Sequence, residues 1–384
     1  MIATRRTMVV ACITMLAGSG VFVAPGVAAV SGTCSSLNSV TAVSATDVWA
    51  VGVVCSTSGS AARTLTMHFN GSSWRVVKSA NKGGFDNQLY DVVALSHRNA
   101  WAVGTYAKNS RGLDGPLIEH FNGTGWHVVT TPPVTSGATT LRSIAAVSAR
   151  DIWAVGYWRR DNAGGAVALH WDGTAWHRAK APAGTSYMLH AVTAVSADDV
   201  WATGERTTNG HQATLAMHWN GTAWNVVHTP NAGTRKNNFL EGAGTAVSSS
   251  DVWVTGSYDA GAANTTRFRT LVLHWNGTRW SIVASPNRGL SDLYGGAAST
   301  STEDVWAVGG GGRNTTLIEH WNGQRWSLTD SPSPGTKVNQ LNGVVAVSAS
   351  HAFAVGYRSG DVDHPHALVL RWDGTAWRVQ PSAT

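Results

Sequence analysis

Hydrophobic and polar positions alternate in short runs separated by turn residues, and this arrangement returns seven times along the 384 residues. In the segment 37–52, LNSVTAV alternates, SATD marks a turn, and DVWAVG alternates back. Alternation of period two is typical of β-strands with one face against a core. LTMHF then predicts a third strand, NG a two-residue hairpin, and WRVV a fourth strand. Each repeat therefore predicts four antiparallel strands.

Two recurring phrases, AVSxxDVWAVG and HWNGTxW, locate the copies in identical or looser form. They place the repeats near residues 37–80, 89–132, 141–182, 189–230, 240–286, 293–332 and 341–384. A lone four-stranded sheet with aromatic residues on both faces cannot bury them, whereas seven sheets around an axis can. We therefore expect an all-β fold, a seven-bladed β-propeller that forms a single domain over residues 30–384.

The pattern AVSxxDVWAVG…HWNGTxW resembles that of secreted actinobacterial seven-bladed β-propeller repeat proteins, and it is loosely similar to tectonin-type propeller lectins. The resemblance covers all seven repeats and implies the propeller fold, but it carries no catalytic motif. The chain lacks the GH…WD pairing of WD40 blades, the paired glycines of kelch blades and the Asp-box of sialidases. The functions of those other propellers therefore do not transfer to this chain.

Residues 1–29 have the parts of a signal peptide: Arg5 and Arg6 supply positive charge, an apolar run follows, and small residues end at Ala29. We expect cleavage near Ala29 and a secreted, extracellular protein, by the general or the twin-arginine route. No later apolar run approaches the length of a membrane span, so we expect no membrane insertion. The formal charge of +6 comes from scattered residues, which argues against a nucleic-acid partner.

Of the three cysteines, Cys12 lies in the predicted signal, which leaves Cys34 and Cys55. If the turn at 44–47 closes a hairpin, these two residues face each other to within one pleat or a bulge. An exported pair in this position predicts a disulfide in the first repeat. Because no terminal strand remains to complete a split blade, we expect the ring to close by packing of the first repeat against the seventh.

Residues that recur in nearly every repeat are interpreted as scaffold, and residues that occur once are candidates for function. Eighteen of the 19 tryptophans occupy recurring positions, and Trp158 is the exception. Six histidines recur at one position, and turn aspartates recur before the VW phrase; we interpret the former as structural and expect the latter to bind nearby backbone amides. The segment DVDHPH at 361–366 is interpreted as a solvated loop, so no metal and no cofactor are predicted.

Variation between repeats concentrates in two connections, which an up-and-down blade places on the same face of the propeller. The connection after AVG is expected to be a loop that holds the ligand-binding candidates Tyr106, Tyr157, Trp158, Arg159, Glu205, Arg206, Tyr258, Tyr357 and Arg358. A second set lies at or near the start of the inner strands and is expected to surround the channel mouth: Asn38, Tyr90, Arg142, His190, Asn342, Glu241 and Tyr294.

Aromatic rings that stack on sugars, together with Arg and Glu side chains that bind hydroxyls, predict a non-catalytic, lectin-like protein. Its partner would be an extracellular or cell-surface glycan, and it could serve as the targeting subunit of an assembly with other secreted proteins. Trp158→Ala is expected to abolish polysaccharide retention and to leave thermal stability unchanged. An aromatic residue that caps the blade edge is the alternative role for Trp158.

Two other functions remain open. A polysaccharide lyase could use Arg142 to neutralise a uronate carboxylate and Tyr90 and His190 as acid and base, with Glu241 and Tyr294 beside them. A protein–protein interaction scaffold is the third possibility, because propellers often serve as platforms. The lack of a catalytic motif favours a binding protein over an enzyme.

Overall fold

The computed structural model describes residues 33–56, 61–110, 114–134, 137–161, 163–182, 186–233, 236–261, 267–360 and 364–382. The predicted signal peptide and the first half of the DVDHPH segment lie outside these residues. Within the described ranges, no helix has the length and apolarity needed to cross a membrane.

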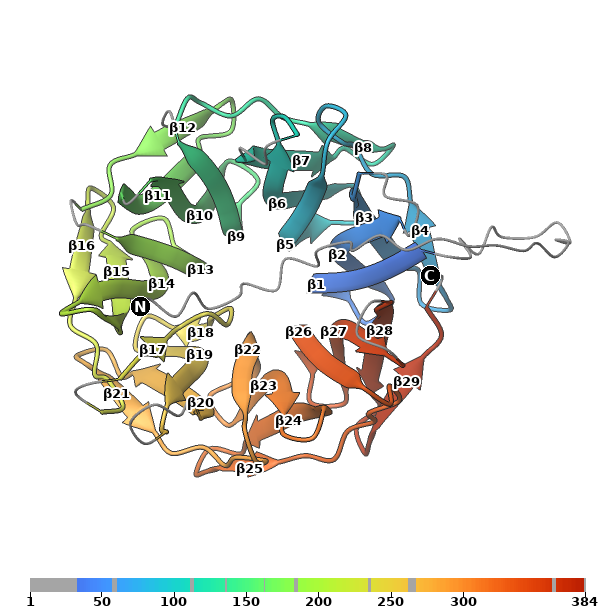
Figure 1. Cartoon of the computed structure of the whole chain (residues 1–384), viewed down its shortest axis with the longest axis vertical. Coiled ribbons are helices and arrows are strands. Elements are labelled where there is room, and N and C mark those ends of the chain that lie inside the picture. The colour runs from blue at the N-terminus through green and yellow to red at the C-terminus, as the bar shows by residue number, and fades with distance from the viewer. Residues whose placement is uncertain are drawn as a thin grey trace, which may run out of the picture.

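The described residues form seven antiparallel sheets around a central axis, with the strands of each blade in chain order from the inside outward (Figure 1). Blades one to three comprise β1 (Thr33–Ser44), β2 (Asp47–Ser56), β3 (Arg63–Phe69), β4 (Trp74–Val77), β5 (Asn87–Ser96), β6 (Asn99–Ala107), β7 (Asp114–Phe121), β8 (Trp126–Val128), β9 (Ala138–Ser148), β10 (Asp151–Arg160), β11 (Ala163–Trp171) and β12 (Trp176–Ala179). Blades four and five comprise β13 (Tyr187–Ser196), β14 (Asp199–Thr208), β15 (His211–Trp219), β16 (Trp224–Val227), β17 (Asn238–Phe239), β18 (Thr245–Ser248), β19 (Asp251–Asp259), β20 (Phe268–Trp275) and β21 (Trp280–Val283). Blades six and seven comprise β22 (Asp292–Ser301), β23 (Asp304–Gly311), β24 (Thr315–Trp321), β25 (Trp326–Leu328), β26 (Val338–Ser348), β27 (His351–Ser359), β28 (His366–Trp372) and β29 (Trp377–Gln380).

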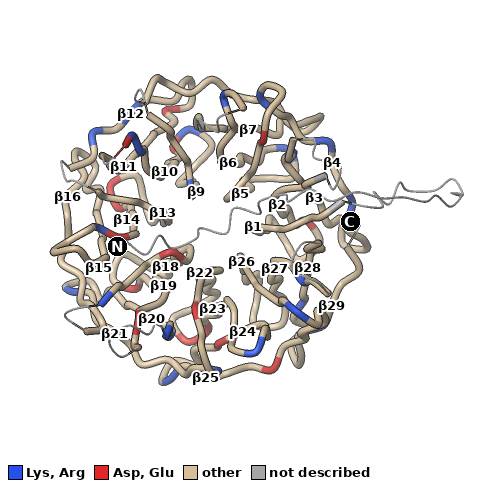
Figure 2. The backbone as a smooth tube through the Cα atoms, in the orientation of Figure 1, with Lys and Arg blue, Asp and Glu red and all other residues tan. Residues whose placement is uncertain are grey.

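The predicted seven-bladed β-propeller is therefore confirmed. Six blades have four strands, while in blade five the inner strand is divided into β17 and β18, which both pair with β19. Figure 2 shows Lys and Arg interspersed with Asp and Glu around the ring.

The recurring aromatic residues pack between neighbouring blades. Trp153 of blade three is buried against Trp219 and Trp224 of blade four, with ring centroids 4.9 and 5.2 Å apart. Its other neighbour is His170, whose ring is stacked on it at 4.3 Å and whose Nε2 donates to Asp151 Oδ1 at 2.8 Å. The structural interpretation of the recurring histidines is confirmed. The turn aspartates bind these histidines, however, which corrects the expectation that they bind nearby backbone amides.

The seventh repeat lacks both the recurring tryptophan and the recurring histidine that stacks on it. Phe353 stands in place of the tryptophan, and Arg371 in place of the histidine. The Arg371 guanidinium lies 5.6 Å from the Phe353 ring and 5.8 Å from the Phe69 ring of blade one, so it keeps contact with the aromatic core.

Blade one closes the ring by packing against blade seven, as expected. Leu37 and Val40 share a core cluster with Phe353, and Asn342 Nδ2 donates to the Leu37 carbonyl at 2.8 Å. Cys34 pairs in register with Cys55, with Cα atoms 5.1 Å apart, and the two form the predicted disulfide. The disulfide therefore holds together the hairpin that meets the seventh blade.

The glycine of each AVG-type phrase permits a close approach between the backbones of the first and second strands of the blade. At Gly156, a Cβ atom would lie 1.9 Å from the Thr140 carbonyl oxygen, so only glycine fits. The glycines at 52, 104, 204, 256, 309 and 356 have the same 1.9 Å approach. Beside this contact, the inner strands of five blades contain a β-bulge, which shifts the pairing register. The extra residue of a bulge interrupts the alternation of side chains, so its own side chain can point in a different direction.

Two glutamates are fully buried between blades, a feature that the sequence analysis did not anticipate. Glu119 accepts hydrogen bonds from Ser79 Oγ at 2.7 Å and from the Ala80 amide at 3.2 Å. Burial raises its pKa to about 7, against the opposing effect of these bonds. Burial also raises the pKa of Glu319 to about 8, partly offset by Ser285. Both carboxyl groups therefore resist ionisation in the folded protein.

Candidate functional site

A cavity of about 640 Å³ lies in the central channel, and every blade contributes to its lining. The end of the channel at which the inner strands begin is its mouth. The bulge residues of the inner strands are part of this lining, and so are the residues of the longer irregularities in blades five and six. These are Asn38, Tyr90, Arg142, His190, Glu241, Tyr294 and Asn342. The structure thus brings together the whole second set of candidates from the sequence.

Blades five and six depart from the single-residue bulge. Residues 240–244 separate β17 from β18, and in β22 the register shifts between Asp292 and Gly296, where Gly296 has a φ of +82°. Glu241 and Tyr294 lie within these irregular segments, and the Tyr294 hydroxyl donates to Glu241 Oε1 at 3.0 Å. Glu241 and Tyr294 therefore do not occupy the single-residue bulge position of the other five blades.

Two of the bulge residues serve the scaffold. Asn38 Nδ2 donates to the Leu89 carbonyl of blade two at 2.6 Å, and Asn342 makes the equivalent bond to blade one. Asp91, also in the cavity lining, bridges three inner strands by accepting hydrogen bonds from Ser39 Oγ at 2.6 Å and Ser143 Oγ at 2.7 Å. These polar groups therefore tie blades together around the channel.

Arg142 provides a positive charge among aromatic side chains. Its guanidinium lies 4.3 Å from the centre of the Tyr90 ring. The pKa of Arg142 lies above its ordinary value: burial acts to lower it, but Tyr157, Tyr90, Tyr294 and Glu241 together outweigh that effect. The group is charged at any physiological pH, and in this partly buried position it can bind a ligand oxygen through its planar fork.

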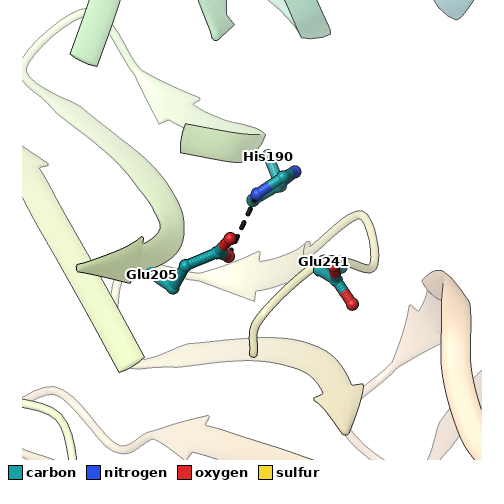
Figure 3. A group of neighbouring side chains, drawn as sticks. All are labelled: His190, Glu205 and Glu241. Carbon is teal, nitrogen blue, oxygen red and sulfur yellow. Dashed lines mark ion pairs between the residues drawn. The ribbon is translucent and has the colours of Figure 1, made fainter. Parts of the chain in front are cut away.

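His190 lies next to two carboxylates and a phenol. Its Nε2 is 3.0 Å from Glu205 Oε2, and the side chains of His190 and Glu205 are only 9% and 5% exposed. The Tyr157 ring centre is 5.8 Å from the imidazole. Glu241 completes a group of three in which the possible ligand atoms all lie within 4.8 Å of one another (Figure 3).

The residues after each AVG phrase lie in strands, which corrects the prediction of a loop. Tyr157, Trp158 and Arg159 continue β10 and pair with both β9 and β11, and Arg160 pairs with β11. The remaining candidates of this set lie in the corresponding parts of β6, β14, β19 and β27: Tyr106, Glu205, Arg206, Tyr258, Tyr357 and Arg358.

Strand alternation divides this first set between two environments. The position directly after the glycine points toward the mouth: Tyr157 and Glu205 approach His190, and Tyr357 lines the cavity. The next position points the other way, so that Trp158 and Tyr258 pack against cores between blades, as does Tyr106. The candidates that follow the AVG-type glycines therefore do not form one continuous binding surface.

Trp158 is half-buried and combines two contacts. It packs against the core between blades two and three, and its Nε1 would lie 2.9 Å from a Cβ atom at Gly165. A second cavity of about 420 Å³ lies beside it, with Arg178 and Pro182 among the lining residues. The expectation that Trp158→Ala leaves stability unchanged is not compatible with this packing.

We predict instead that Trp158→Ala lowers the free energy of unfolding by about 2 kcal/mol, because it removes part of an interblade contact. Denaturant unfolding followed by tryptophan fluorescence measures the change. Arg160→Ala, at an exposed position of the same strand, is the control and should unfold like the wild type. If Trp158→Ala unfolds at the same denaturant concentration as the wild type, Trp158 does not contribute to interblade packing.

No family model matches the chain, and no curated protein matches it either. Among solved structures, the polysaccharide lyase PL25 ulvan lyase has a TM-score of 0.55 at 9% identity, covering 91% of this chain and 96% of that one. YCF48 bound to D1 peptide has a TM-score of 0.54 at 16% identity, with 88% and 92% covered. The six-bladed fucose lectin of Aleuria aurantia reaches 0.46 at 15% identity, with 77% and 96% covered. At these identities the likeness to the ulvan lyase and to YCF48 shows the propeller fold alone.

Proposed function

We propose that the protein is a non-catalytic, glycan-binding propeller whose binding site is the channel mouth. The observation that carries this proposal is the ring of inner-strand residues around the cavity of about 640 Å³, in which Arg142 lies among tyrosines and carboxylates. This volume lies within the range of small-molecule binding sites, about 300–1,000 Å³. Rings such as Tyr90 and Tyr294 offer flat faces to the C–H side of a sugar, and Arg142 and Glu241 offer complementary bonds to its oxygens and hydroxyls.

The proposed partner is an extracellular or cell-surface glycan. Disulfides such as Cys34–Cys55 form and persist in oxidising compartments, which supports the proposed secretion. A role as the targeting arm of an assembly with other secreted proteins is part of this proposal.

The test is retention on a panel of immobilised neutral and uronic-acid polysaccharides, followed by titration calorimetry with the best oligosaccharide. Arg142→Gln is expected to weaken binding at least tenfold, because it removes the charge and the planar fork. Arg98→Gln is the control, since Arg98 lies on the exposed tight-turn face and should not affect retention. Normal binding by Arg142→Gln, with loss in Trp158→Ala, would move the site from the mouth to the rim.

A polysaccharide lyase is the second candidate, favoured by the cationic Arg142 directly over the Tyr90 phenol. In such a β-elimination a base removes the C5 proton of a uronate, the C4–O4 bond breaks, and an acid protonates the departing O4 as the C4–C5 double bond forms. Incubation with uronic-acid polymers would then yield an unsaturated product that absorbs ultraviolet light. Tyr90→Phe should abolish that signal if the candidate is right, and no signal from the wild type would exclude it for those polymers.

A further inference from the structure

The three-residue group at the mouth has the composition of a metal site. We propose that His190, Glu205 and Glu241 bind one first-row divalent cation, Zn²⁺ or Mn²⁺, with water or a ligand oxygen in the remaining positions. The proposal does not depend on the glycan-binding function.

The three side chains reach one place from separate segments. His190 comes from the bulge of β13, Glu205 from the position after the AVG-type glycine in β14, and Glu241 from the segment between β17 and β18 (Figure 3). Their possible ligand atoms lie within 4.8 Å of one another. Zinc is bound at about 2.0–2.2 Å by imidazole nitrogen and carboxylate oxygen, so small side-chain rotations suffice to place all three atoms around one ion.

Burial provides the second observation. The His190 side chain is 9% exposed, and neither of its ring nitrogens has a hydrogen-bond partner in the described part of the protein. Nε2 and Glu205 Oε2 are 3.0 Å apart but are not aligned for a hydrogen bond. Two ligand atoms that each bind one ion at about 2.1 Å lie about 3.0 Å apart at a right angle and about 3.4 Å apart at a tetrahedral angle, so the observed separation is close to that of two ligands of one ion. An ion would satisfy one ring nitrogen and the carboxylate, which otherwise incur a desolvation cost.

Charge also favours a divalent cation. Glu205 and Glu241 bring two negative charges close together in a partly enclosed space, and Arg142 from β9 supplies one positive charge near Glu241. The group offers one imidazole nitrogen and at most four carboxylate oxygens, which is fewer than the six to eight oxygen ligands that Ca²⁺ takes. One imidazole and two carboxylates suit Zn²⁺ and Mn²⁺, and three protein ligands leave positions open toward the cavity.

The occupied site would alter the chemistry of the mouth in a specific way. A cation beside Arg142 would turn a region with two carboxylates into one that attracts ligand oxygens, including those of a sugar. It would also engage His190, so that a tyrosine would have to act as the base in any elimination at this site.

The test uses the chelator-treated protein without any glycan. Titration calorimetry with Zn²⁺, Mn²⁺ and Ca²⁺ is expected to show one site for Zn²⁺, weaker binding of Mn²⁺ and none of Ca²⁺, and a rise in thermal midpoint should follow the same order. Addition of Co²⁺ as a spectroscopic probe is expected to give a visible absorption band from a site that contains an imidazole.

Variants decide whether this group is the ligand set. Glu205→Gln and Glu241→Gln should each weaken Zn²⁺ binding at least tenfold. His218→Gln, which removes a recurring histidine of the same blade that pairs with Asp199, should bind Zn²⁺ like the wild type. Equal binding by all these proteins would place the ion on surface histidines and overturn the proposal, as would no binding by the folded wild type. Because glycan retention is measured separately, with chelator present, either proposal can fail alone.

Discussion

Gly156→Ala is expected to lower the free energy of unfolding by at least about 3 kcal/mol, because the added methyl group has no room between the strands. The new Cβ atom would lie 1.9 Å from the Thr140 carbonyl oxygen and 2.9 Å from the Leu141 Cα. Both are backbone atoms, so no side-chain rotation relieves the contact. The strands β9 and β10 would have to separate, which disturbs the bulge that places Arg142 in the mouth.

Urea unfolding of Gly156→Ala measures this loss. Gly84→Ala is the matched control, because no atom lies within 4 Å of its added Cβ and the residue is in an exposed bend. If the two variants unfold at the same urea concentration, the close approach at the AVG glycines does not limit the packing of the blade.

Glu119→Gln and Glu319→Gln are expected to stabilise the protein at pH 8 and to have much smaller effects at pH 4.5. The folded-state pKa values of about 7 and about 8 lie above the ordinary glutamate pKa of 4.5. The favourable contribution of the protonated carboxyl is therefore complete below about pH 4.5 and is lost as the pH rises through 7 to 8. At about 1.4 kcal/mol per pKa unit, each site accounts for a few kcal/mol across this window. An amide keeps the shape of the neutral acid and does not ionise.

Thermal unfolding of the double variant between pH 4.5 and pH 8.5 is the measurement. The wild type should lose stability over this interval, and the double variant should lose less. Glu303→Gln, at an exposed position, should follow the wild-type curve. Parallel curves for the double variant and the wild type would show that the two carboxyl groups ionise normally in the folded state.

The fold was predictable because each repeat states the same pattern. Period-two alternation around SATD and NGT gave the strands, and residues such as Tyr90, Arg142 and His190 were found because they break a repeat at one shared position. That position is the bulge, whose existence the sequence signals only through the recurring glycine. A glycine inside a strand pattern is a known sign of a bulge or of close backbone approach.

The extent of the second strand was not predictable in the same way. The polar side chains of Arg159 and Arg160 suggested a loop. The end of β10 is exposed to solvent, however, so polar side chains are tolerated there and the strand pairing continues. The histidine–aspartate pairing left a usable signal, since the seventh repeat loses both residues together. A glutamate directly before the recurring histidine, in place of Met or Leu, likewise marked Glu119 and Glu319 as unusual.

The glycine–bulge pair has a consequence for how such a protein can change. Packing between blades depends on the recurring tryptophans, whereas the bulge residues Tyr90, Arg142 and His190 line the cavity. The residues that would bind a ligand and the tryptophans that hold the blades together thus occupy different positions of the repeat. The same propeller can therefore carry a different set of side chains at its mouth. A new binding specificity can arise there without a change of fold.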